Sequence, residues 1–215
     1  MYNLKKELPF IIIALIPFVY LAYIYNDLPK ILPMHYDIHG NVDRYGKKSE
    51  LILLTSILSG IGYFIFLLIP RMDPNIDIEK LATKYTAIRF VIAGFITVIL
   101  LFILQGSTSD TINLKLFFAI FGLFFAFLGN YFKTIKPNYF IGIRTPWTLE
   151  NETVWKKTHL ISGNIWFVGG ILIAFSYFLP NDINKIVVFS LFGIIILFPI
   201  IYSFLEFKKY KTEKL

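Results

Sequence analysis

Residues 138–159 read NYFIGIRTPWTLENETVWKKTH, a polar interval between two apolar runs that could each cross a bilayer. This segment contains two of the three tryptophans of the chain. Gly142 and Pro146 mark backbone turns on either side of Arg144. The flanking apolar runs predict that the chain is a membrane protein that presents this segment at one face of the bilayer.

The composition supports the same class. Charged residues make up 16% of the 215 residues and apolar residues 56%, whereas soluble domains contain about a quarter charged residues. Cysteine is absent, which excludes disulfides, zinc–thiolate sites and iron–sulfur clusters. The net charge of +7 could suggest a nucleic-acid partner, but the positions of the charges indicate orientation in a bilayer instead. We therefore expect no direct contact with nucleic acid.

Apolar runs long enough to span a bilayer predict an all-α integral membrane protein with six transmembrane helices. The predicted spans are 8–26, 51–69, 90–105, 116–132, 160–179 and 186–205. A separate short surface helix is expected over 77–89, and Pro70 is expected to end the second span. We divide the chain into a two-helix domain, 1–70, with an external loop at 27–50, and a four-helix domain, 71–215, with a cytoplasmic loop at 133–159.

Lysine and arginine predict the orientation. The loops expected outside the cell contain six of the 21 basic residues, namely Lys30, Arg44, Lys47, Lys48, Lys115 and Lys185. The other fifteen flank the spans on the opposite side. Because basic residues concentrate in cytoplasmic loops, both termini are predicted to be cytoplasmic.

The segment after Arg144 predicts a short amphipathic helix. Thr145 is a suitable N-cap and Pro146 a suitable first helical residue. Trp147 and Trp155 fall on one helix face, so the helix is expected to lie in the membrane interface with both indoles at headgroup depth. Such a helix also requires lipid as a partner.

An interfacial helix does not account for Asn138, Gly142, Arg144 and His159. A guanidinium beside two turn residues can bind a lipid phosphate or a carboxylate of a partner protein. Docking of a specific partner and a purely interfacial helix both remain open on these residues alone.

The external loop contains a possible metal site. If residues 34–39 are extended, His35, Asp37 and His39 share one face, and two histidines with a carboxylate can bind zinc. The alternative is a loop whose histidines form hydrogen bonds to the backbone. We expect the latter, with no metal and no cofactor.

The spans carry few polar groups and no charge near their middle. Asn130 and Asn164 are expected to form hydrogen bonds between helices. Pumps and coupled transporters usually contain ionisable residues inside the membrane. No GxSxG, HExxH or phosphate-binding glycine loop is present, so no catalytic residue is predicted.

Both loops resemble known bacterial membrane families. The pattern Leu32-Pro33-x-His35, Gly40-Asn41-x-Asp43-Arg44 and Lys48 resembles an N-terminal two-helix domain of unknown function. The run from Asn138 to Leu149, followed by Val154 to His159 and Ser162-Gly163, resembles the SdpI family, which is named for the immunity protein against the sporulation-delaying toxin of bacilli. His39 departs from that pattern, in which a small or polar residue is expected.

The resemblance implies a non-enzymatic protein of the cell membrane that protects its cell from a secreted peptide toxin and sequesters a cytoplasmic helix-turn-helix autorepressor. The residues expected to face the toxin are Pro33, His35, Gly40, Asp43 and Lys48. Those expected to face the repressor are Asn138, Gly142, Arg144, Thr145, Pro146, Trp147, Trp155 and His159. A metal-dependent membrane-face enzyme using His35 and His39 and a small-molecule transporter are the alternatives.

Overall fold

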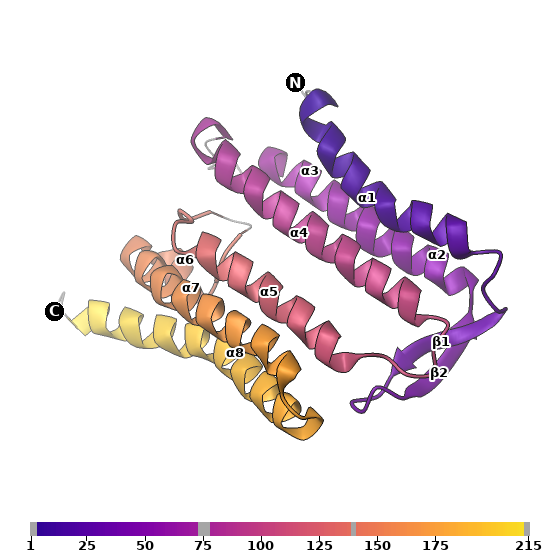
Figure 1. Ribbon diagram of the computed structural model, residues 1–215. Coiled ribbons are helices and arrows are strands. Elements are labelled where there is room, and N and C mark those ends of the chain that lie inside the picture. The colour runs from indigo at the N-terminus through magenta and orange to yellow at the C-terminus, as the bar shows by residue number, and fades with distance from the viewer. Residues whose placement is uncertain (1–3, 73–77, 139–140, 213–215) are drawn as a thin grey trace. The chain divides into compact units, whose positions relative to one another are not determined.

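The computed structural model describes residues 4–72, 78–138 and 141–212, and its described part consists of helices and one β-hairpin (Figure 1). The helices in chain order are α1 (Leu4–Ile24), α2 (Ser49–Thr55), the π-helix η1 (Ser56–Ile61), α3 (Gly62–Met72), α4 (Ile78–Gly106), α5 (Leu114–Phe132), α6 (Pro146–Glu150), α7 (Glu152–Phe175), the 3-10 helix η2 (Ser176–Phe178) and α8 (Asn181–Thr212). The hairpin strands are β1 (Ile31–Tyr36) and β2 (Val42–Lys47).

Within the described residues, six helical segments are long and apolar enough to cross a membrane. They are Lys5–Ile24, Ser49–Leu68, Tyr85–Gly106, Leu114–Phe132, Glu152–Phe178 and Asn181–Thr212. The all-α membrane architecture predicted from the apolar runs is therefore confirmed. The second span continues from α2 through η1 into α3, which extends past Pro70 to Met72.

Two compact units divide the chain. The first contains residues 1–70 and 85–120, and the second contains residues 71–84 and 121–215. Helices α4 and α5 each contribute residues to both units. The first unit thus contains the predicted two-helix segment together with most of α4 and the start of α5.

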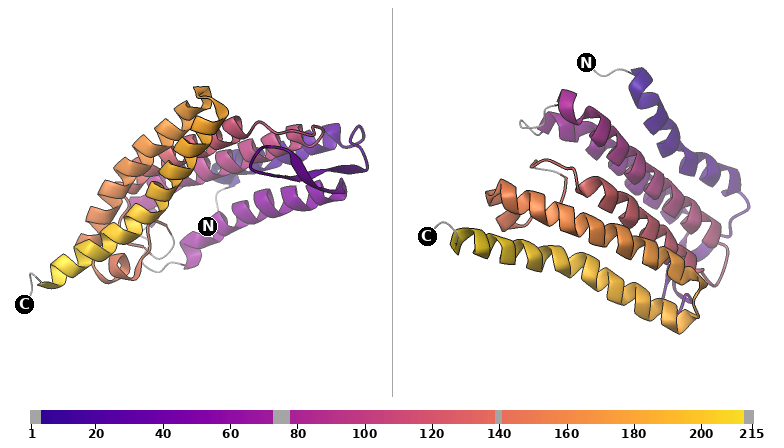
Figure 2. Two further views of the ribbon diagram at one scale, coloured as in Figure 1. Left: turned by 90° about the horizontal axis from the view of Figure 1, so that it is seen from below. Right: turned by 60° about the vertical axis from the view of Figure 1, so that its left-hand side comes forward.

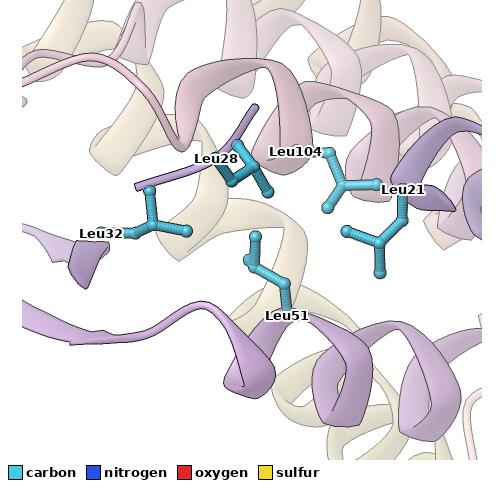
Figure 3. Packing of buried hydrophobic residues seen from close by; sticks show 5 residues of the cluster. All are labelled: Leu21, Leu28, Leu32, Leu51 and Leu104. Carbon is cyan, nitrogen blue, oxygen red and sulfur yellow. The ribbon is translucent and has the colours of Figure 1, made fainter. Parts of the chain in front are cut away.

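The first unit is centred on a leucine cluster below the hairpin. Leu32 on β1 is fully buried, and Leu51 and Leu104 are almost so. With Leu21 of α1 and Leu28 of the α1–β1 connection, they form one cluster between α1, the hairpin, α2 and α4 (Figure 3). Burial of apolar side chains at about 25 cal/mol per Å² holds the hairpin against these helix ends.

The hairpin itself is antiparallel, with Ile31 opposite Lys47 and Leu32 opposite Gly46. Gly40 lies in its turn with φ +84, a conformation that favours glycine. The Ile112 N–H donates to the Gly40 carbonyl at 3.0 Å, which fastens the turn to the α4–α5 connection. The sequence predicted an irregular polar loop here, and the two strands are a finding of the structure.

Helix α1 contains Pro17, which cannot donate to the Ile13 carbonyl. The Thr97 hydroxyl of α4 donates to that carbonyl at 3.0 Å. On the other side, the Ser59 hydroxyl of η1 donates to the Ala14 carbonyl at 2.6 Å. A carbonyl freed by proline inside a membrane needs such a partner, so the Thr97 hydroxyl supports a proline within the first span, and the Ser59 hydroxyl adds a second link from α1 to η1.

Close contact between α5 and α7 organises the second unit. A Cβ at Gly122 would lie 2.6 Å from the Gly170 carbonyl oxygen, and one at Gly129 would lie 2.6 Å from the Gly163 carbonyl oxygen. Both helices therefore place glycines seven residues apart at the crossing, where only glycine fits. Helix α8 runs beside α7 in both views of Figure 2, and a Lys157–Glu206 ion pair joins them.

Two helix predictions are wrong. The expected surface helix over 77–89 is not separate, because α4 continues without interruption from Ile78 through the third span; Asp77 lies outside the described residues. The helix expected after Arg144 is two helices. Helix α6 ends at Glu150, and Asn151 caps α7 by accepting from the Thr153 and Val154 N–H groups, so α7 continues directly into the fifth span.

Candidate functional site

An aromatic pair supports the segment around Arg144 from below. Trp155 is fully buried and His159 is 1% exposed. Their rings stack with centroids 4.1 Å apart, and the Trp155 indole N–H donates to the Ile135 carbonyl at 2.9 Å. Trp155 is thus a core residue, and the prediction that its indole lies at headgroup depth is wrong.

His159 links this pair to the turn above it. Its Nε2 accepts from the Ile143 N–H at 2.8 Å, and its Nδ1 lies 2.9 Å from the Trp155 carbonyl oxygen. The first bond requires an unprotonated Nε2, so the ring is a neutral imidazole with its proton on Nδ1. His159 therefore fixes the backbone one residue before Arg144.

Gly142 is required where the turn crosses the aromatic pair. Its φ is +124, and a Cβ there would lie 2.5 Å from His159 Nε2 and 3.1 Å from Trp155 Cζ2. A side chain would be strained by the backbone conformation and would collide with both rings. The sequence prediction that Gly142 marks a turn is confirmed.

Polar side chains close both ends of the turn. Asn138 donates to the Lys136 and Ile141 carbonyls and accepts from the Ile141 N–H. Thr145 caps α6 by accepting from the Thr148 N–H at 3.3 Å, and the Thr148 hydroxyl accepts from the Thr145 N–H at 3.0 Å. The predicted Thr145 cap with Pro146 at the helix start is confirmed.

Arg144 is presented outward by this support. Its side chain is exposed, and the described residues give it no hydrogen bond or ion pair. Trp147 is half-buried and packs on Phe204 of α8, with ring centroids 5.1 Å apart. We call residues 141–148 the Arg144 turn. It carries an unpaired guanidinium on a backbone that is fixed before binding, which limits the entropy lost when a partner docks.

Tyr139 and Phe140, part of the family motif, lie outside the described residues.

The hairpin in the first unit presents a second polar surface. His35 Nδ1 lies 2.6 Å from Asp43 Oδ1, across the two strands, and both side chains are well exposed. Arg44 and Glu50 form a further exposed pair at 3.2 Å. Tyr36 and Tyr45 hold the hairpin in place by donating to Gly106 and Asp110 respectively. The result is a rigid surface carrying both charge signs.

The condition for a shared metal-binding face, an extended chain over residues 34–39, holds only as far as Tyr36. Strand β1 ends at Tyr36, because Asp37 Oδ1 accepts from the His39 and Asn41 N–H groups and turns the chain. The bond from the Asn41 backbone is the main reason that the pKa of Asp37 is below its ordinary value. Its carboxylate is engaged in the turn, and no group of three or more His, Cys, Asp or Glu in the described part of the chain could hold a metal ion.

Lys48, predicted to face a partner, is turned inward. Its ammonium donates to the Tyr25 carbonyl at 3.0 Å and lies 4.4 Å from the centre of the Tyr25 ring. It thereby satisfies a carbonyl that follows α1. Pro33 is half-buried in β1. His35 and Asp43 are therefore the exposed candidates on the hairpin, and Gly40 shapes its turn.

Sequence reasoning missed several residues that hold these sites. Thr148 completes the cap as the third residue after Thr145, a spacing that resembles a capping box with threonine in place of glutamate. The glycine pairs at seven-residue spacing in α5 and α7 could also have been found from the sequence. Neither Asn130 nor Asn164 forms the expected interhelical hydrogen bond within the described residues, and both side chains are exposed.

The fold and the two surfaces define a multi-pass membrane protein that carries an exposed hairpin in one unit and a braced cationic turn in the other. Residues 134–203, which contain the Arg144 turn, match the SdpI/YfhL protein family. Residues 12–59, which contain the hairpin, match DUF1648, a domain of unknown function.

The chain is 26% identical over 212 residues to "Immunity protein SdpI" of Bacillus subtilis (strain 168), and the match covers 96% of this chain and 98% of that protein. The resemblance to the SdpI family indicated by the two loops is thereby confirmed. No solved structure matches the chain.

Proposed function

We propose that this protein is a membrane immunity protein that protects its cell from a secreted peptide toxin and has no catalytic role. The observation that carries the proposal is the similarity to an immunity protein over nearly the whole length of both chains. The match includes both the hairpin and the Arg144 turn. The similarity therefore extends to both candidate surfaces and is not limited to two of the helices.

The orientation is part of the proposal. With six spans, the hairpin follows the first and the Arg144 turn lies between the fourth and fifth, so the two lie on opposite sides of the bilayer. The excess of lysine and arginine beside the termini and the Arg144 turn favours the cytoplasm for that side. The hairpin then faces the outside of the cell.

Cysteine labelling tests this orientation. The chain has no native cysteine, and Asn41 and Glu150 are both exposed. Cysteine at Asn41 is expected to react with a membrane-impermeant maleimide in intact cells, whereas cysteine at Glu150 is expected to react only after permeabilisation. Labelling of Glu150→Cys alone in intact cells would invert the orientation.

On the outer side, we assign toxin contact to the exposed part of the hairpin. His35 and Asp43 offer a paired donor and acceptor on a surface that the leucine cluster holds rigid. Exposed ion pairs contribute little to stability, so these side chains are available for binding without a large structural role. Lys48 and Gly40 act by shaping the hairpin.

Resistance in living cells tests the function. Bacilli that lack their own immunity protein and express this chain are expected to survive the sporulation-delaying toxin. His35→Ala and Asp43→Ala are expected to reduce that survival with normal amounts of protein, because each removes an exposed contact. Lys30→Ala, an exposed charge on the same loop, is the matched control. Normal amounts of membrane-inserted wild-type chain without protection would refute immunity to this toxin.

On the inner side, we assign docking of a cytoplasmic helix-turn-helix repressor to the Arg144 turn. The supporting features are a guanidinium without a hydrogen bond or ion pair to the described residues, its exposure and the fixed backbone on either side. Such a turn can bind a carboxylate of a soluble partner through charge-assisted hydrogen bonds. Substitution of Arg144 tests direct contact with the repressor. Substitution of Trp155 tests the support that holds the turn in place.

A further inference from the structure

Lys133, the residue after α5, directs its ammonium toward the membrane. A Cβ at Gly163 of α7 would lie 2.9 Å from the Lys133 Cγ. The ammonium lies 5.4 Å from the centre of the Phe167 ring, which is one helical turn farther into the fifth span than Gly163 and is 41% exposed. A lysine at the end of a span normally extends toward water. Lys133 instead extends along α7, and no carboxylate among the described residues pairs with it.

Two exposed asparagines lie on the same side of the α5–α7 pair as this ammonium. Gly129 and Gly163 face each other where the antiparallel helices cross, so residues at equal offsets from them lie on one side and at one depth. The contact of Lys133 with the aromatic ring joins residues four positions after each glycine. Asn130 and Asn164 follow the glycines directly and are each one helical turn from that contact. Both side chains are exposed, and neither amide has a hydrogen bond to a described residue.

We propose that Lys133, Asn130 and Asn164 bind the phosphate of an anionic phospholipid, in the leaflet on the side of the Arg144 turn. The ammonium supplies a positive charge that no described carboxylate neutralises, and each carboxamide supplies N–H donors. A phosphodiester offers the negative charge and the acceptor oxygens that these groups need. A headgroup with net negative charge is favoured over a zwitterionic one, because Lys133 repels the cation of the latter.

The depth of the cluster fits a lipid phosphate. Asn130 lies two residues, about 3 Å, before the end of α5. Asn164 lies four residues, about 6 Å, beyond Leu160, where the apolar run of the fifth span begins. Hydrocarbon offers an amide no hydrogen-bond partner, whereas a headgroup at the edge of the apolar layer does. The acyl chain then extends along the exposed ring of Phe167. This site does not depend on the immunity proposal.

Lipid retention by the purified full-length chain tests the site. The protein in non-ionic detergent is titrated with phosphatidylglycerol and, separately, with phosphatidylcholine of the same acyl chains, and native mass spectrometry counts the bound lipid. Lys133→Met removes the ammonium and keeps an unbranched side chain against Gly163. Lys136→Met is the matched control, because Lys136 is an exposed lysine of the same loop that lies beyond the crossing.

We expect the wild-type chain to retain one phosphatidylglycerol and to bind phosphatidylcholine about tenfold more weakly. Lys133→Met is expected to weaken phosphatidylglycerol binding about tenfold, and Asn130→Leu and Asn164→Leu about fivefold each, since each removes donors to a charged group. Lys136→Met is expected to bind like the wild-type chain. Unchanged elution and thermal unfolding without added lipid would show that the fold of each variant is intact.

Equal phosphatidylglycerol binding by Lys133→Met and the wild-type chain would overturn the site. Equal retention of both lipids by the wild-type chain would show adsorption through the acyl chains alone and would also contradict it. In a third arm, inorganic phosphate is added to the lipid-bound protein and is expected to displace nothing; displacement would indicate a site for a free anion instead of a lipid. If Lys133→Met does not fold, the two asparagine variants decide, because both side chains are exposed and unchanged binding by both would exclude the cluster.

Discussion

Arg89→Ala is expected to lower the free energy of unfolding by about 3–5 kcal/mol, because it leaves a buried carboxylate without its partner. Arg89 donates to both oxygens of Glu7, at 2.9 and 2.6 Å. The two side chains are only 10% and 13% exposed. The guanidinium also lies 4.0 Å from the centre of the Phe10 ring, so the substitution removes packing as well as charge. Thermal unfolding of the purified protein in detergent measures the loss.

Two comparisons separate the buried pair from general damage. Lys156→Ala breaks the exposed pair with Glu152, at 2.9 Å, and is expected to cost only about 0.3–0.5 kcal/mol. Replacing Glu7 and Arg89 together by leucine is expected to cost less than Arg89→Ala alone, because no buried charge remains. An Arg89→Ala protein as stable as Lys156→Ala would show that Glu7 is solvated and not held by the pair.

The Glu7–Arg89 pair also shows where sequence reasoning ends. The six spans could be predicted, because an unbroken apolar run of about 20 residues is long enough to cross the bilayer as a helix. The partners of charged residues could not. Glu7 and Arg89 are separated by 82 positions, and each lies beside a predicted span, where a charge is normally solvated. Only the packing of α4 against α1 brings them together.

The same limit applies to the Arg144 turn. The cap at Thr145 was predictable, because it depends on residues three positions apart. The spacing of Trp147 and Trp155 suggested one face of a single amphipathic helix, but a pattern cannot distinguish a face that meets lipid from one that meets protein. It also did not reveal Asn151, which starts a new helix and turns Trp155 toward Ile135 and His159.

The hairpin was missed for another reason. Short strands with a polar outer face give a weak signal beside strong apolar helices, and here a single buried residue, Leu32, carries most of the alternation. Gly40 was expected only among the residues that face the toxin. Its role in the turn depends on its positive φ and on the Ile112 carbonyl oxygen, which a Cβ at Gly40 would approach to 2.8 Å.

Trp155→Ala is expected to destabilise the protein by about 3–5 kcal/mol, as truncation of a fully buried tryptophan does. It removes the stacking on His159 and the hydrogen bond to Ile135, so the Arg144 turn loses its support. We therefore expect lower thermal stability together with loss of repressor recruitment. Both effects follow from one structural cause.

Arg144→Ala is the contrasting variant. Its side chain is exposed, so stability is expected to change by no more than about 0.5 kcal/mol. If the guanidinium contacts the repressor, losing a charge-assisted hydrogen bond costs on the order of 2 kcal/mol, roughly thirtyfold in affinity. The measurement is membrane recruitment of a fluorescent fusion of the bacilli autorepressor in the presence of toxin, with the amount of each variant determined in parallel. Full recruitment by normally expressed Arg144→Ala would exclude Arg144 as a contact. The turn would then serve only to connect α5 to α7.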